Sequence, residues 1–242
     1  MSVFALFSDI FARQDNRLAR VDPRTKLAVA AVALVCLVLS GGAVFPVGLF
    51  ALCTTMTLAV GVPLRQVMVR LAAPLGMAGA AVALRWLLQA GPLGSGLLIV
   101  GRVLGGVSVM LLLSAVTPAH QLFRALRVWG MPRGWVEVAL LMYRYTFVFL
   151  DVVADLTAAQ KVRMGYAGVR LAWRSAGVAA GTVILRSVDQ AVHAHEAMLV
   201  RGYRGEMPFG PLRPLARRDW VMAAAAALLL IGAFWVLEWR LG

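Results

Sequence analysis

Two histidines and a glutamate stand close together near the end of the chain, and all three are residue types that could bind a metal ion. They lie in the stretch His193-Ala194-His195-Glu196. On a helix, residues two apart lie about 200° apart around the axis, so both imidazoles cannot reach one ion. The zinc-site spacing His-Glu-x-x-His is also absent. We therefore interpret the histidines as surface or structural residues and predict no metal site.

Motifs for bond-making chemistry are missing from the sequence. It contains no Gly-x-x-x-x-Gly-Lys-Ser/Thr loop to hold ATP phosphates, no Gly-x-Ser-x-Gly nucleophile motif and no dense group of aspartates beside an apolar segment. Acidic residues are nearly absent from the apolar segments, which argues against a proton relay. We expect a protein that is not an enzyme and carries no cofactor.

Two arginines stand at the ends of two long helical patterns. The endings are Val162-Arg163-Met164-Gly165-Tyr166 and Val200-Arg201-Gly202-Tyr203. Arginine in a last turn, followed by glycine, is an ordinary helix C-terminus that the helix dipole and a left-handed cap favour. The repeated ending also fits two rigid projections that each present a cation to an acidic groove of a partner. The sequence leaves both interpretations open.

The elements that position these residues follow from an apolar composition. Of 242 residues, 61% are hydrophobic and 14% are charged, and the mean hydropathy is +0.81. Soluble domains average about 45–50% apolar residues and about 25% charged residues. A transmembrane helix needs about 20 mostly apolar residues. We therefore predict an all-α polytopic membrane protein with about five transmembrane helices. Two spans are expected within 27–64, divided by a turn at Ser40-Gly41-Gly42 and Pro46, and one each at 71–90, 97–116 and 221–237.

Positive charge is concentrated on one side of these spans. Of the 24 Lys and Arg residues, five lie in 1–26, two in an expected loop at 63–70 and fourteen in 118–219. The turns at 41–46 and 91–96, on the other side, contain none. The positive-inside rule then places the N-terminus, the loop with Arg65 and the stretch 118–219 in the cytoplasm, with the C-terminus outside. The net charge of +13 is thus explained by orientation, and no nucleic-acid partner is expected.

Four residues inside the apolar segments need an interpretation of their own. Arg85 and Arg102 could be interfacial anchors that snorkel to the headgroups, or they could make polar contacts with a membrane partner. The sequence leaves this choice open. Cys36 and Cys53 have no Cys-x-x-Cys spacing and no polar neighbours, so we interpret them as small buried hydrophobes.

The stretch 118–219 is predicted to form amphipathic cytoplasmic helices. Its part 136–150 is apolar enough to be a further span, although Arg144 in its middle argues against lipid exposure on that side, and the sequence leaves this open. Thr117-Pro118 is a helix-start signal, a second helix is expected from Pro132 to Tyr166, and a third from Ala176 to Arg201 with small residues at 176–181 for close helix contact. The third has an apolar stripe at helical spacing, formed by Val188, Ala191, Val192, His195 and Leu199. The predicted organisation is therefore 1–118 with four spans, 119–219 as a cytoplasmic coupling-helix unit, and 220–242 as the last span.

Four short motifs, in order, resemble the transmembrane T component of energy-coupling factor (ECF) transporters, and within that family the cobalt/nickel-type, CbiQ-like member. They are Asp22-Pro23-Arg24-Thr25-Lys26-Leu27, Leu141-Met142-Tyr143-Arg144-Tyr145, Ala159-Gln160-Lys161-Val162-Arg163 and Ala197-Met198-Leu199-Val200-Arg201-Gly202-Tyr203. The resemblance covers nearly the whole chain.

This resemblance implies a scaffold in the bacterial cytoplasmic (inner) membrane that couples two ABC-type ATPases to a substrate-binding membrane S component, for cobalt or nickel uptake. ATP hydrolysis would then take place in the separate ATPase subunits. By motif match, Arg163 and Arg201 would be the residues that dock on the ATPases. Their neighbours Val162, Met164, Val200 and Gly202 would complete the docking ends, although the family usually has alanine where the two valines stand. The alternative is a self-sufficient permease that binds its own substrate, which would require broken helices with polar groups at mid-membrane.

Overall fold

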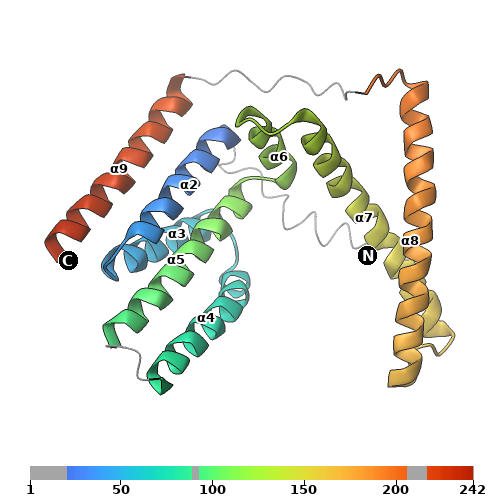
Figure 1. Ribbon diagram of the computed structural model, residues 1–242, viewed down its shortest axis with the longest axis horizontal. Coiled ribbons are helices and arrows are strands. Elements are labelled where there is room, and N and C mark those ends of the chain that lie inside the picture. Colours follow the sequence, from blue (N-terminus) through green and yellow to red (C-terminus); the bar gives the residue numbers. More distant parts are fainter. Residues whose placement is uncertain (1–20, 89–92, 206–216, 242) are drawn as a thin grey trace. The chain divides into compact units, whose positions relative to one another are not determined.

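The computed structural model describes residues 21–88, 93–205 and 217–241 (Figure 1). These residues form α-helices and no strand occurs among them, so the predicted all-α architecture is confirmed. The chain divides into two compact units, each considered by itself, and α6 (Ala119–Val128) runs across the boundary between them. The apolar unit contains α2 (Pro23–Leu39), α3 (Val44–Ala59), α4 (Leu64–Leu87), α5 (Leu93–Val116) and α9 (Arg217–Leu241), and the hairpin unit contains α7 (Arg133–Val162) and α8 (Val169–Val200).

The start of α2 is fixed by the Asp-Pro step. Asp22 is the N-cap, and its side chain accepts a hydrogen bond from the backbone N–H of Arg24 at 3.0 Å. Pro23 occupies the first helical position, where a missing N–H leaves no bond unmade. Lys26 Nζ donates to the carbonyl oxygen of Val116 at 3.3 Å. The first turn of α2 is thereby joined to the last turn of α5.

In the apolar unit, α2 packs against α5 and α9, and α3 packs against the same two helices (Figure 1). Phe45 and Phe234 meet edge to face, with ring centroids 5.5 Å apart. Cys36 and Cys53 are free, buried thiols in the same core, as predicted. The buried residues of this core are mostly small: Ala30, Ala33, Cys36, Leu37, Phe45, Leu49, Cys53 and Val109.

Glycines on α5 allow α2 and α3 to approach closely. A Cβ atom at Gly105 would lie 3.0 Å from Leu37 Cδ1 and 3.2 Å from the carbonyl oxygen of Pro46. A Cβ at Gly101 would lie 3.2 Å from Pro46 Cβ. Such close backbone contacts stabilise helix pairs in lipid, where burial of apolar surface gives little driving force. Pro46 itself lies in the first turn of α3, where proline is tolerated, and not in the preceding turn.

Among the described residues, three helices are long and apolar enough to cross a membrane: α4, α5 over Gly96–Val116, and α9 over Asp219–Leu237. α3 is apolar but has 16 residues, and α2 has 17, close to the lower limit of about 17 residues for a spanning helix. Every predicted span is thus a helix, and two of the helices are short. The chain is a multi-pass membrane protein.

Two predictions about α4 and α5 need correction. The loop expected at 63–70 is wrong, because α4 begins at Leu64 and Arg65 and Arg70 lie on its first turns. Pro63, with ψ 137°, is the N-cap and starts the helix before the apolar run begins. The turn predicted at Gly91-Pro92-Leu93-Gly94 is only partly described, because 91 and 92 lie outside the described residues while Leu93 and Gly94 already belong to α5.

The start of α6 also differs from the prediction. Thr117 does not act as a side-chain cap, since its buried Oγ1 atom makes no hydrogen bond. The backbone N–H groups of Gln121 and Leu122 instead donate to the carbonyl oxygen of Pro118, at 3.0 and 3.2 Å. The helix therefore begins at Ala119, one residue later than expected.

In the hairpin unit, α7 begins directly after Pro132, as predicted, but ends at Val162 and not at Tyr166. α8 begins at Val169, seven residues before the predicted Ala176, because the extended Gly168 (φ −163°, ψ 160°) is its N-cap. The small residues of 176–181 do not form a close helix contact within this unit. Only Ala179 among them is buried, and no atom would come within 4 Å of a Cβ at Gly177 or Gly181.

Candidate functional site

The end of α7 is a Schellman cap with an arginine at the cap position. Arg163 (φ −83°, ψ 14°) directly follows the last helical residue. The N–H of Met164 donates to the carbonyl of Lys161 at 3.0 Å, and the N–H of Gly165 donates to that of Gln160 at 2.8 Å. These two bonds satisfy carbonyl groups that a helix end would otherwise leave open.

The end of α8 repeats this geometry. Arg201 (φ −84°, ψ 9°) occupies the cap position. The N–H of Gly202 donates to the carbonyl of Leu199 at 2.9 Å, and the N–H of Tyr203 donates to that of Met198 at 3.0 Å. The two arginines therefore stand at the same place in the same type of helix end.

The two ends differ in the residue that takes the left-handed conformation. In α8 it is Gly202 (φ 80°), as a left-handed glycine cap predicts, but in α7 it is Met164 (φ 59°). Gly165 follows for a different reason, because a Cβ there would lie 2.6 Å from Ser175 Oγ and 3.0 Å from the Gln160 carbonyl oxygen. Glycine at 165 is thus required by packing rather than by φ.

A network of side chains braces the end of α7 against the start of α8. Gln160 Nε2 donates to the carbonyl of Ser175 at 2.9 Å, and the hydroxyl of Tyr166 donates to Gln160 Oε1 at 2.9 Å. Ser175 Oγ donates to the carbonyl of Gly165 at 3.0 Å. The role of Ser175 was missed from the sequence, because it lies outside the helix-ending pattern and nothing in its local sequence marks it.

Both capping arginines are exposed, and each follows an exposed valine. Val162 and Val200 show 85% and 89% of their surface to solvent, Met164 shows 69%, and Gly202 is exposed as well. Each tip therefore presents a small apolar group beside a guanidinium.

The two tips lie at opposite ends of α8 (Figure 1). Arg163 belongs to the α7 end, which is bonded to the first turns of α8, whereas Arg201 follows the last turn of α8. α8 has 32 residues, so at 1.5 Å per residue its ends are about 48 Å apart. One groove of ordinary size therefore cannot hold both tips.

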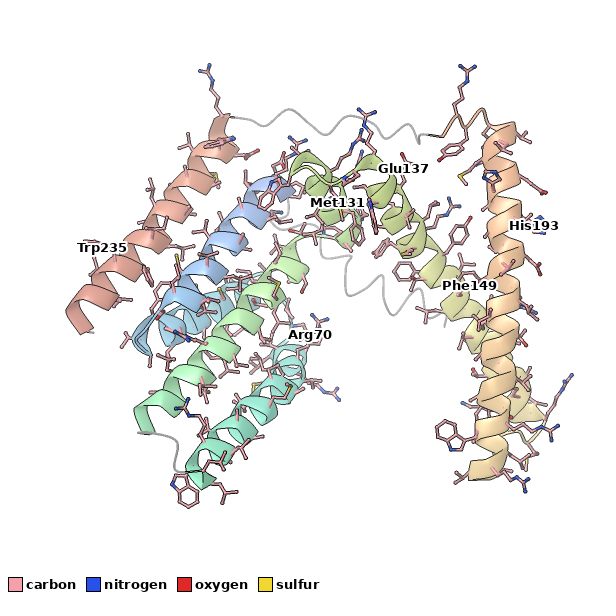
Figure 2. All side chains as sticks on the ribbon, viewed as in Figure 1. Arg70, Met131, Glu137, Phe149, His193 and Trp235 are labelled. Carbon is pink, nitrogen blue, oxygen red and sulfur yellow. The ribbon has the colours of Figure 1, made fainter. Side chains whose placement is uncertain are left out.

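The histidines do not form a metal site. His193 Nδ1 and Glu196 Oε2 lie 3.7 Å apart, on a solvent-exposed face of α8 (Figure 2). Within the described part of the chain, no group of three or more His, Cys, Asp or Glu side chains could hold a metal ion.

The two intramembrane arginines are placed differently. Arg85 lies in the last turn of α4, next to the exposed Trp86, where the helix dipole favours a cation. Arg102 lies within α5, and its Nη2 donates to the carbonyl oxygen of Ser40, the C-cap of α2. Arg102 thus joins α5 to the turn between α2 and α3. A contact of either arginine with a membrane partner stays a prediction.

The aromatic motif in the middle of α7 makes local contacts along one helix. Tyr143 and Phe147 meet edge to face with centroids 5.0 Å apart, and the guanidinium of the exposed Arg144 lies 6.0 Å from the Tyr145 ring centroid. α7 is not among the described helices that are long and apolar enough to span a membrane.

Comparison with known proteins identifies a family. The family model CbiQ, described as "Cobalt transport protein", matches residues 14–209. A cobalt transport protein CbiQ from Rhodobacter capsulatus is 33% identical over 185 residues, which cover 71% of this chain and 75% of that protein.

Two further relatives share shorter segments. The cobalt transport protein CbiQ of Salmonella typhimurium is 29% identical over 105 residues, or 43% of this chain and 47% of that protein. A putative fused cobalt transport protein CbiMQ from Methanocorpusculum labreanum is 29% identical over 110 residues, or 46% of this chain and 18% of that protein.

Proposed function

The chain belongs to the CbiQ family of cobalt transport proteins, and we propose that it is the transmembrane coupling subunit of an ECF-type ABC importer for cobalt or nickel. In this proposal the α7 and α8 ends dock on two separate ABC-type ATPases, and the apolar unit holds the subunit in the bacterial inner membrane. ATP hydrolysis belongs to the ATPases, and substrate binding belongs to a separate membrane S component. The chain itself catalyses no reaction.

The observation that carries the proposal is the repeated helix end. Arg163 and Arg201 share one capping geometry, and each stands beside an exposed valine at one end of α8. An exposed guanidinium can pair bidentately with a carboxylate in an acidic groove. If the arginine is buried in that groove, its removal weakens the binding free energy by about 2–5 kcal/mol.

The separation of the tips supports two docking places. Because about 48 Å of helix lies between them, two ATPase subunits would each receive one tip. A rigid α8 would then convert a change in the distance between the ATPases into a movement of the whole hairpin unit. The hydrogen bonds of Gln160 and Ser175 join the α7 end to α8, which supports joint movement of the two helices.

A membrane partner is supported by the face of α8 between its ends. The predicted stripe includes Val188, Val192 and Leu199, which are all exposed in this chain. Their spacing places them on one helix face, which suits an apolar partner such as an S component. The fused relative, in which the matching segment covers 18% of the protein, also suits a subunit that works beside another transport segment.

Co-purification from detergent with the ABC ATPases encoded next to this chain tests the proposal. We expect the tagged wild type to retain the ATPases, Arg163→Glu and Arg201→Glu to retain less, and the double variant to retain none. Arg186→Glu is the matched control, since Arg186 is an exposed arginine between the ends of α8, and it should behave as wild type.

Other outcomes would reject parts of the proposal. Equal retention by wild type and by the folded double variant would mean that the arginines are only helix caps. If the wild type bound no ATPase, the self-sufficient permease would become the better hypothesis, and binding of cobalt by the purified chain alone would then be expected.

A further inference from the structure

The corner between α6 and α7 exposes apolar side chains on a rigid turn. Gly130 takes a left-handed conformation (φ 98°). The N–H of Met131 donates to the carbonyl of Leu126 at 3.3 Å, and the N–H of Gly130 donates to the carbonyl of Arg127 at 3.4 Å. This is the same type of cap that ends α7 and α8. Figure 2 labels Met131 at this corner. The backbone therefore holds the corner in a defined shape.

Large apolar side chains cluster at this corner. Val128 and Trp129 are about half exposed, at 50% and 51%, and Trp135 in the first turn of α7 is 68% exposed. Met131 between them is 37% exposed. Two exposed tryptophans within seven residues are typical of the membrane interface, where an indole ring is partly apolar and partly hydrogen-bonded.

Positive charge predominates at the corner, although Glu137 follows one helical turn after Arg133. From residue 117 to 136 the chain contains Arg124, Arg127 and Arg133 and no acid, and the first acid, Glu137, is buried. Arginines beside exposed aromatic residues fit a surface of anionic headgroups, because phosphate accepts hydrogen bonds from guanidinium while the rings enter the acyl boundary.

The position of the corner along the chain points to the same partner. α5, a membrane-length helix, ends at Val116, and α6 begins at Ala119. The two residues between them span at most about 10 Å, so α6 starts at the membrane surface. α6 has 10 residues and is about 15 Å long, which keeps the corner within reach of the headgroups when α6 lies flat.

We propose that the corner formed by Arg127, Val128, Trp129, Met131, Arg133 and Trp135 is an anchor that binds the anionic lipid surface of the membrane. It fixes the start of α7 at the headgroups while the two helix tips remain in water. The hairpin unit would then rotate about this corner when it moves.

A fluorophore on Val128→Cys in the full chain tests the anchor, because Cys36 and Cys53 are buried and should not react. The chain is placed in nanodiscs of phosphatidylcholine alone or mixed with phosphatidylglycerol. We expect acyl-brominated lipid to quench the label, and phosphatidylglycerol to shield it severalfold from acrylamide, a neutral aqueous quencher. Arg127→Gln/Arg133→Gln should remove that shielding. Arg170→Gln/Arg174→Gln, the same charge change in the first turns of α8, should not.

A label on Val200→Cys, at the exposed tip of α8, provides the reference for full access to water. The proposal is overturned if the Val128→Cys label is as accessible to acrylamide as this reference in both kinds of disc. If the label were shielded equally with and without phosphatidylglycerol, the corner would be covered by protein rather than by anionic lipid. That result would also overturn the proposal. The comparison of the two discs uses unchanged arginines, so it stands even if the arginine variants fold poorly.

Discussion

Arg163 and Arg201 occupy equivalent positions, each between a final helical valine and a residue of positive φ. The equivalence is in the backbone, since the same two hydrogen bonds close both ends. The residues that permit it are different, because Met164 takes the left-handed conformation at one end and Gly202 at the other. The direction of each arginine therefore depends on its cap, and the caps can be tested separately from the arginines.

Gly202→Ala should weaken the end of α8. A side chain in the left-handed region costs about 1 kcal/mol or more, so the local opening of the last turn should become about fivefold more frequent. Hydrogen exchange of a peptide spanning 196–205 measures this opening. Gly177→Ala is the control of opposite sign, because Gly177 lies in the helix interior with open space around it, and alanine there should stabilise α8 by about 0.5–1 kcal/mol. If both substitutions changed hydrogen exchange at 196–205 equally, the left-handed cap at Gly202 would not be what stabilises the end of α8.

Gly165→Ala should disrupt the brace between α7 and α8. The new Cβ would lie 2.6 Å from Ser175 Oγ and 3.0 Å from a backbone oxygen, and overpacking of this kind costs about 1–3 kcal/mol. The expected result is faster hydrogen exchange at 160–175 and weaker ATPase retention, with Arg163 unchanged. Ser175→Ala should cost less alone and should partly rescue Gly165→Ala, because it removes the nearest atom. Simple additivity in this double-mutant cycle would argue against the contact.

The sequence predicts the apolar helices well because hydropathy over about 20 residues is a strong signal, and this placed α5 and α9 within a few residues of their observed bounds. It predicts the two arginine ends because they recur in one pattern. It fails where long-range contacts decide, as at Ser175 and at Thr117, whose hydroxyl does not cap α6. A left-handed methionine is also invisible in sequence, because glycine is the usual residue at that position.

Gly105→Ala should destabilise the apolar unit while its neighbour tolerates the same change. The added Cβ would meet Leu37 at 3.0 Å and a backbone oxygen of Pro46 at 3.2 Å, and backbone yields less than a side chain. We expect a loss of about 1–3 kcal/mol, seen as a lower melting temperature in detergent. At Gly106 the nearest atom is a Leu37 methyl carbon at 3.5 Å, an ordinary contact. If Gly106→Ala lowered the melting temperature equally, packing at α5 would not be the cause.

The valines at the two tips should matter for docking and not for folding. Val162 and Val200 are exposed by 85% and 89%, so Val162→Ala/Val200→Ala should leave the melting temperature unchanged or raise it slightly, since alanine is the better helix former. If the tips enter apolar pockets of the ATPases, the alanine variant should still co-purify with them, whereas Val162→Asp/Val200→Asp should not, because it buries unpaired charges. If the aspartate variant retained the ATPases, the valines would remain in water in the complex. The docking contacts would then come from the arginines and not from the valines.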